Sequence, residues 1–223
     1  MTTMILRRPS LLLPVAGAFV AGAALALAVA AAPRPQSDAK APAQEGAAPT
    51  FTKEDMERAM AQMKTMVSPG PHHKELARFL GTWKTTTRFV MGGTKTPGEA
   101  GTATVSWLMD GRWLKFDLGG SMMKRPYTGF VLMGYDNFKR SFVSTSVTSI
   151  DTAMVRLEGD MDPSGKALLM YGTLDEYTTG EHDKMVKYVY RFESPDRMVL
   201  EVHDLPIGET NTQVVEVVFE RAS

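Results

Sequence analysis

Histidine is the residue type in this chain that is best suited to catalysis or metal binding, and it occurs four times. His72 and His73 are adjacent, His182 stands in a Gly-Glu-His-Asp segment, and His203 precedes Asp204. His203 beside a carboxylate has the composition of a metal ligand or a proton carrier, although a structural residue at a rim is the commoner outcome. Without a G-x-S-x-G motif beside it, the His-Asp pair does not indicate a hydrolase.

The thioether sulfur of methionine is a second candidate for metal binding. Met56, Met60, Met63 and Met66 recur at spacings of four, three and three, which puts them on one face of a helix. With the two adjacent histidines they could supply soft ligands for Cu(I). The alternative is an amphipathic helix that rests its adaptable Met face on the folded domain or on a partner. We favour the alternative, because no second Met or His cluster follows.

Aromatic residues indicate binding more than catalysis. They are concentrated in segments with the alternation of strands, where they serve as wall and core residues in any case. Those that face inward would line a pocket for an apolar or aromatic ligand, with Arg191 or Arg156 as a polar contact. We expect no catalytic residue, no metal ligand and no cofactor. The expected ligand-binding residues are Trp83, Trp107, Tyr127, Tyr135, Arg191 and His203.

Composition excludes several classes of function. The 223-residue chain has 25 basic and 25 acidic residues, and it contains no run of basic residues that would bind nucleic acid. It has no cysteine, so disulfides, thiol catalysis, thiolate metal sites and a lipid-modified cysteine are all excluded. The fold must therefore be stabilised by burial of a hydrophobic core alone.

The first 30 residues resemble an export signal. A basic start with Arg7 and Arg8 precedes an uncharged segment at 11–32, and Ala28-Val29-Ala30 fits an A-x-A cleavage site. The apolar run is also long enough to span a bilayer, so an uncleaved membrane anchor is the alternative. In both cases we expect the rest of the chain to lie outside the cytoplasm, in the periplasm or its equivalent. Membrane contact is expected only through an uncleaved segment.

A linker and a helix follow this leader. Residues 31–51 are rich in Pro and Ala and too poor in large apolar side chains to form a core. Thr52 is a plausible N-cap for the Met-rich helix at 52–67, since Glu54 and Asp55 fall in its first turn. Prolines 69 and 71 must end that helix, and a short second helix then precedes Gly81.

From residue 83 the hydrophobic period changes from 3.6 to 2, which predicts about ten strands with short connections. Asp110-Gly111 between two alternating segments is the strongest hairpin signal. Consecutive antiparallel strands avoid exposed edges most simply by closing into an up-and-down barrel. We therefore predict an all-β domain over 68–223. The expected strands are 83–91, 102–109, 112–118, 126–135, 141–148, 154–160, 166–177, 184–192, 197–203 and 212–221.

Several spaced motifs in this domain resemble those of the DUF1579 family of bacterial proteins. They are Pro69-Gly70-Pro71-x-His73-Lys74-x-Leu76, Gly81-Thr82-Trp83, Tyr127-x-Gly129-Phe130, Gly134-Tyr135-Asp136-Asn137, Asp162-x-x-Gly165-Lys166 and Pro206-x-Gly208-Glu209. The resemblance implies a calycin-like barrel, similar to lipocalins, fatty-acid-binding proteins and nitrobindins, and brings no established reaction with it. Residues 147–153 depart from the family pattern. In relatives, the corresponding segment looks like Trp-x-Asp-Ser-Met.

Together these observations predict an exported, non-catalytic barrel that binds a small apolar molecule in its interior. One alternative is an envelope interaction module that docks a partner through its outer wall and Met-rich helix. A weaker alternative is a metal- or haem-handling protein, but the last strand offers no axial histidine for a haem. A homo-oligomer is compatible with each of these, and no nucleic-acid partner is expected.

Overall fold

The computed structural model describes residues 52–176, 179–205 and 212–222. The leader expected at 1–30 and the linker expected at 31–51 therefore lie outside the described residues. In the described part of the chain, no helix has the length and hydrophobicity needed to cross a membrane.

The first helix, α1 (Lys53–Val67), begins where the sequence predicted. Thr52 Oγ1 accepts a hydrogen bond from the Asp55 backbone at 3.1 Å, and the Asp55 carboxylate accepts one from the Thr52 backbone at 3.2 Å. This reciprocal capping satisfies two backbone groups that the helix start would otherwise leave unpaired. α1 ends at Val67, with Ser68 as its C-cap directly before Pro69, and buries none of its residues.

Two short helical segments close one end of the sheet. They are α2 (Pro71–Glu75) and the 3₁₀ turn η1 (Leu76–Phe79). Leu76 and Phe79 are fully buried, whereas the residues between them are more exposed. The chain then turns into the first strand at Gly81, whose φ of 113° is a conformation that glycine adopts without strain.

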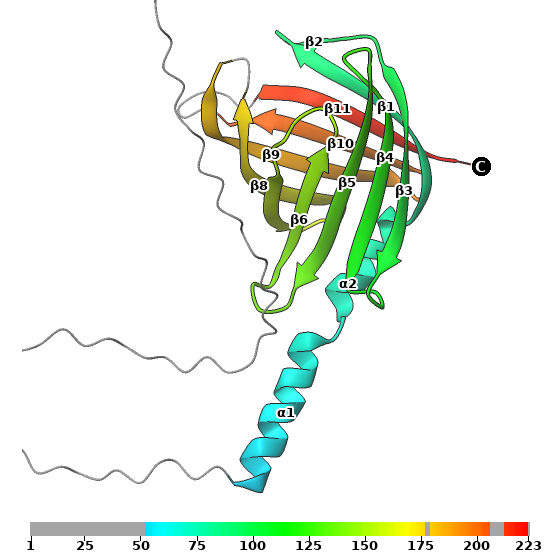
Figure 1. Cartoon of the computed structure of the whole chain (residues 1–223). Helices are drawn as coiled ribbons and strands as arrows, with labels where there is room; N and C mark the ends of the chain where they lie inside the picture. The colour runs from blue at the N-terminus through cyan, green and yellow to red at the C-terminus, as the bar shows by residue number, and fades with distance from the viewer. Residues whose placement is uncertain (1–51, 177–178, 206–211, 223) are drawn as a thin grey trace, which may run out of the picture. The chain divides into compact units, whose positions relative to one another are not determined.

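Ten long antiparallel strands form a closed barrel, as predicted (Figure 1). Each strand pairs with its neighbours in sequence, and β11 pairs with β1 to complete the circle. The two-residue β2 pairs only with the end of β1. The strands are β1 (Gly81–Met91), β2 (Thr94–Lys95), β3 (Glu99–Leu108), β4 (Trp113–Met122), β5 (Arg125–Asp136), β6 (Ser141–Thr148), β7 (Val155–Met161), β8 (Ala167–Glu176), β9 (Glu181–Ser194), β10 (Arg197–Asp204) and β11 (Thr212–Arg221).

Side chains alternate between the two faces of the wall, as the pleat requires. In β1, Trp83, Thr85 and Thr87 are buried, whereas Thr82 and Lys84 are exposed. The register carries this alternation around the barrel, because Thr85 is opposite Phe219 of β11 and Gly101 of β3. Positions that pair directly with an inward residue therefore also point inward.

Aromatic rings cluster at the end of the barrel that α2 and η1 cover. Phe79 packs edge-on against the rings of Phe116, Tyr190 and Phe192, with centroids 5.0–5.7 Å apart. The indole nitrogen of Trp83 donates to the Phe79 carbonyl at 2.8 Å. These contacts form a plug that fills this end of the barrel.

The last strand secures this plug from outside. The guanidinium group of Arg221 lies 4.2 Å from the centre of the Trp83 ring and donates to the Leu80 carbonyl at 2.8 Å. A cation over an indole and a charged hydrogen bond each stabilise such an arrangement by about 1 kcal/mol. The first and last strands are thus joined by side chains as well as by the sheet.

Candidate ligand-binding cavity

The barrel encloses a cavity of about 440 Å³ on the side away from the helices. Its position follows from the residues that line it. Tyr127 lies near the start of β5 and Thr148 at the end of β6. Both belong to the end of the barrel opposite Asp136, next to which Asn137 binds the C-terminal end of α1. The plug around Phe79 forms its floor. A volume of this size falls in the range of small-molecule sites.

Most of the cavity wall is apolar. The side chains come from strands all around the barrel, because every second residue of each strand points inward. The main apolar residues that line the cavity are Phe89, Phe116, Leu118, Phe130, Val131, Leu157, Leu174, Leu200, Val202, Val215, Val217 and Phe219. Such a wall favours an apolar ligand body, since each Å² of apolar surface removed from water stabilises binding by roughly 25 cal/mol.

Hydroxyl groups interrupt this apolar wall. They belong to Thr85 and Thr87 of β1, to Ser144, Ser146 and Thr148 of β6, and to Tyr127, Tyr188 and Tyr190. Burial raises the pKa of the Tyr188 hydroxyl to about 12, and burial likewise raises the pKa values of Tyr190 and Tyr127. These groups are therefore uncharged at neutral pH, and each can both donate and accept a hydrogen bond.

Charged groups occur only toward the open rim, as far as the described lining residues go. Glu176 of β8 and Asp204 of β10 line the cavity there. Lys184 of β9 lies between them, with its Nζ 2.7 Å from the Asp204 carboxylate and 3.9 Å from that of Glu176. The hydrogen bond to Asp204 raises the pKa of Lys184, so the ammonium is charged at neutral pH.

Of the six residues expected to bind a ligand, Tyr127 lines the cavity. Trp83 lies in the plug, fully buried beneath the cavity floor. Trp107 is 37% exposed near the end of β3, on the plugged side of the barrel. Tyr135 stacks on His72 with ring centroids 4.4 Å apart, and it lines a separate cavity of about 240 Å³ beside the end of α1.

The structure places Arg191 and His203 outside the barrel, which corrects our expectation for both. Arg191 binds Glu201 at 2.7 Å, and His203 Nε2 lies 3.5 Å from the other oxygen of the same carboxylate. The reason is alternation: Arg191 directly follows the inward Tyr190, and His203 directly follows the inward Val202. Reading the phase of β9 from its two tyrosines would have found this, and it would also have identified Tyr188 and Tyr190 as lining residues.

The histidines show no arrangement typical of a metal or haem site. All four belong to the described residues, and none lines the interior cavity. His73 Nδ1 accepts a hydrogen bond from the Gly70 backbone at 3.0 Å, and His182 lies on the surface beside Asp175. Over the described ranges, no three His, Asp or Glu side chains gather closely enough to hold a metal ion.

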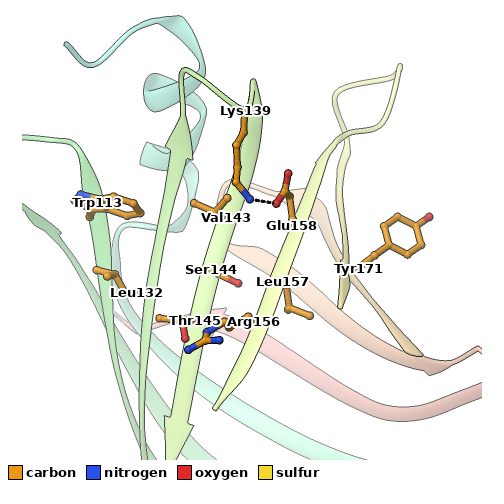
Figure 2. Close-up of a pocket in the computed structure, with 10 residues that line it drawn as sticks. All are labelled: Trp113, Leu132, Lys139, Val143, Ser144, Thr145, Arg156, Leu157, Glu158 and Tyr171. Atoms are coloured by element: carbon orange, nitrogen blue, oxygen red, sulfur yellow. Dashed lines mark hydrogen bonds and ion pairs between the residues drawn. The ribbon is translucent and has the colours of Figure 1, made fainter. Parts of the chain in front are cut away.

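A second hollow lies on the outer face of the wall, over β4 to β8. It measures about 390 Å³, with Trp113 on one side and Tyr171 on the other (Figure 2). The Lys139 ammonium crosses it to the Glu158 carboxylate at 2.5 Å, and Arg156 lies on the same strand as that glutamate. Because this hollow is shallow and lies on the exterior, the interior cavity is the stronger candidate for a ligand.

The fold and the cavity define the class of protein: a calycin-like, closed antiparallel barrel with a largely apolar interior. The chain belongs to the DUF1579 family, described as a protein of unknown function, whose family model matches residues 68–221. This match confirms the resemblance stated from the sequence motifs.

One solved structure with a similar fold is Rv2717c from M. tuberculosis. The two share 11% sequence identity with a TM-score of 0.51, over 70% of this chain and 100% of that chain. At this identity the similarity supports the barrel fold alone. A search among curated proteins finds no match.

Proposed function

We propose that this protein is an exported, non-catalytic barrel that binds a small apolar molecule in its interior. The observation that carries the proposal is the cavity of about 440 Å³, which has a mostly apolar wall and a plugged floor. An empty apolar cavity of this size costs stability that a bound ligand would restore, because its wall lacks contacts on one side.

The non-catalytic part of the proposal rests on the chemistry of the wall. A serine or threonine hydroxyl is a weak nucleophile unless a neighbouring base removes its proton. Ser144 and Ser146 line the cavity, but none of the four histidines does. The two carboxylates that line it, Glu176 and Asp204, lie toward the rim beside the ammonium of Lys184.

Export is supported by the sequence of the leader. A secretory signal peptide has a basic N-terminal region, an apolar central segment and small residues at its cleavage site, and the leader has all three features. The mass of the purified protein tests this directly, because removal of residues 1–30 would leave a chain that begins at Ala31.

Fluorescence of N-phenylnaphthylamine, an apolar dye that brightens on leaving water, tests the binding proposal. We expect saturable binding to the wild-type protein. Val217→Trp fills the cavity and should abolish it, whereas Val218→Trp places the same ring on the outer face and should not. Equal dye binding by the two variants, or no binding by the wild type, would contradict the proposal.

A second candidate function, docking of an envelope partner, is favoured by one observation on α1. Met56, Met60 and Met63 are 57–62% exposed and form one face of a helix that buries nothing. We expected the Met face to rest on the folded domain or on a partner; the barrel leaves Met56, Met60 and Met63 exposed, which leaves the partner. Light scattering of the purified chain tests whether that partner is a second copy of this chain: an oligomer that Met60→Ser disrupts would support it, and a monomer would exclude it.

A further inference from the structure

The chemistry of the cavity wall narrows the class of molecule that it can hold; this inference rests on the proposed function. Below the rim, the described lining residues include no charged side chain. A carboxylate or ammonium group carried into that region would lose its water and find no opposite charge. Burial of an unpaired ion is among the most costly events in protein chemistry.

The rim does not favour an anionic head group either. The ammonium of Lys184 lies beside the carboxylates that line the rim, and it binds Asp204 at 2.7 Å. Glu176 lies 3.9 Å from the same ammonium. A fatty-acid carboxylate placed beside Glu176 and Asp204 would lie close to groups of like charge, which disfavours its binding there.

The interior offers neutral hydrogen-bonding groups instead. Thr87 is only 4% exposed and Ser144 only 9%, yet both line the cavity. Tyr188 adds a phenol that remains protonated, since its pKa is raised to about 12 by burial. A hydroxyl both donates and accepts, so this set suits an uncharged alcohol, ketone or ester group.

One of these groups has no hydrogen-bond partner among the described residues. Thr148 Oγ1 is buried, and it makes no hydrogen bond to any residue that the structure describes. Its side chain belongs to the cavity lining, near the rim and on the same strand as Ser144 and Ser146. Buried polar groups are nearly always paired, so this hydroxyl at the cavity wall is a natural partner for a polar atom of a ligand.

We infer that the ligand is an uncharged molecule with an apolar body and a hydroxyl or carbonyl group, and that free fatty-acid anions are poor ligands. The apolar body lies against Phe116, Leu200 and Val217, and the polar group contacts the hydroxyls of β1, β6 and β9.

Three probes that share a ten-carbon chain and differ in their polar group test this inference. The protein is produced from the full-length sequence and purified. Decanol, decanoate and decylamine compete with N-phenylnaphthylamine at about pH 7, where the second is an anion and the third a cation. We expect decanol to bind at least about tenfold more tightly than either charged probe. Equal or tighter binding of decanoate or decylamine would overturn the inference while leaving the proposed function intact. Failure of the dye itself to bind would instead remove the proposed function and the inference with it.

Removal of the hydroxyls tests their role separately. The combined variant Thr87→Val, Ser144→Ala, Ser146→Ala and Tyr188→Phe should weaken decanol binding about tenfold, because each neutral hydrogen bond contributes a few-fold. The control Thr86→Val with Thr145→Val removes two hydroxyls from the outward positions of β1 and β6 and should leave binding unchanged.

If the combined variant fails to fold, the single changes Thr87→Val and Tyr188→Phe replace it, and each should weaken decanol binding about threefold. Unchanged decanol affinity in the folded inward variants would overturn the role of the hydroxyls.

Discussion

Truncation of Phe79 to alanine should remove the centre of the plug that closes the barrel. The side chain is 1% exposed and packs against the rings of Phe116, Tyr190 and Phe192. Truncation of a buried Phe costs about 3–5 kcal/mol, from the lost transfer free energy and the cavity that remains. The lost edge-to-face contacts contribute about 1 kcal/mol each within that range, so we expect a value near its top, about 4–5 kcal/mol.

Urea denaturation, followed by tryptophan fluorescence, measures this free energy of unfolding. Because the total stability of a domain is about 5–15 kcal/mol, the Phe79→Ala variant should still fold but with a much lower midpoint. Phe138→Ala is the matched control, since this phenylalanine is 72% exposed in the β5–β6 turn and its truncation should cost less than about 0.5 kcal/mol. A loss below about 1 kcal/mol for Phe79→Ala would refute the account of the plug.

The remaining predictions concern pH and the attachment of α1. Burial raises the pKa of the Tyr188 hydroxyl to about 12, whereas a tyrosine in the unfolded chain ionises near 10. Between these pH values the folded protein keeps the phenolic proton and the unfolded chain loses it. The free energy of unfolding should therefore fall as pH rises from about 10 to about 12. Tyr188→Phe should reduce that fall and Tyr171→Phe, at the outer face, should not, as thermal melts across this pH range would show. Asn137 Nδ2 donates to the carbonyls of Met66 and Ser68 at 2.9 Å each, so Asn137→Ala should weaken the junction by about 1–2 kcal/mol. Faster hydrogen exchange confined to α1 and α2 would confirm this effect, and unchanged exchange there would count against it.

Local signals in the sequence predicted most of the fold. Thr52 three residues before Asp55 indicates a capped helix start, and Asp110-Gly111 between alternating segments indicates a hairpin. Alternation itself located the strands to within a few residues, because each strand has one buried and one exposed face. Closure of the barrel followed from the number of strands and their short connections, since an open sheet of this size would leave two unprotected edges.

The site was harder to predict, because alternation does not say which of two faces is the inner one. Val189 makes both faces of β9 partly apolar, so its phase has to be read from Tyr188 and Tyr190 and not from hydrophobicity alone. Arg191 and His203 were assigned inward for their chemistry, against the phase of their neighbours. The inner hydroxyls of Thr87 and Ser144 were not identified, because a threonine or serine in a strand is ordinarily an exposed residue.

Native mass spectrometry of the protein purified from its own host tests the central claim most directly. The account predicts a wild-type species with one uncharged small molecule bound, and an unliganded Val217→Trp variant whose cavity is filled. A wild-type protein that is free of any bound molecule, and that does not take up N-phenylnaphthylamine when the dye is added, would contradict the claim that the barrel interior is a binding site.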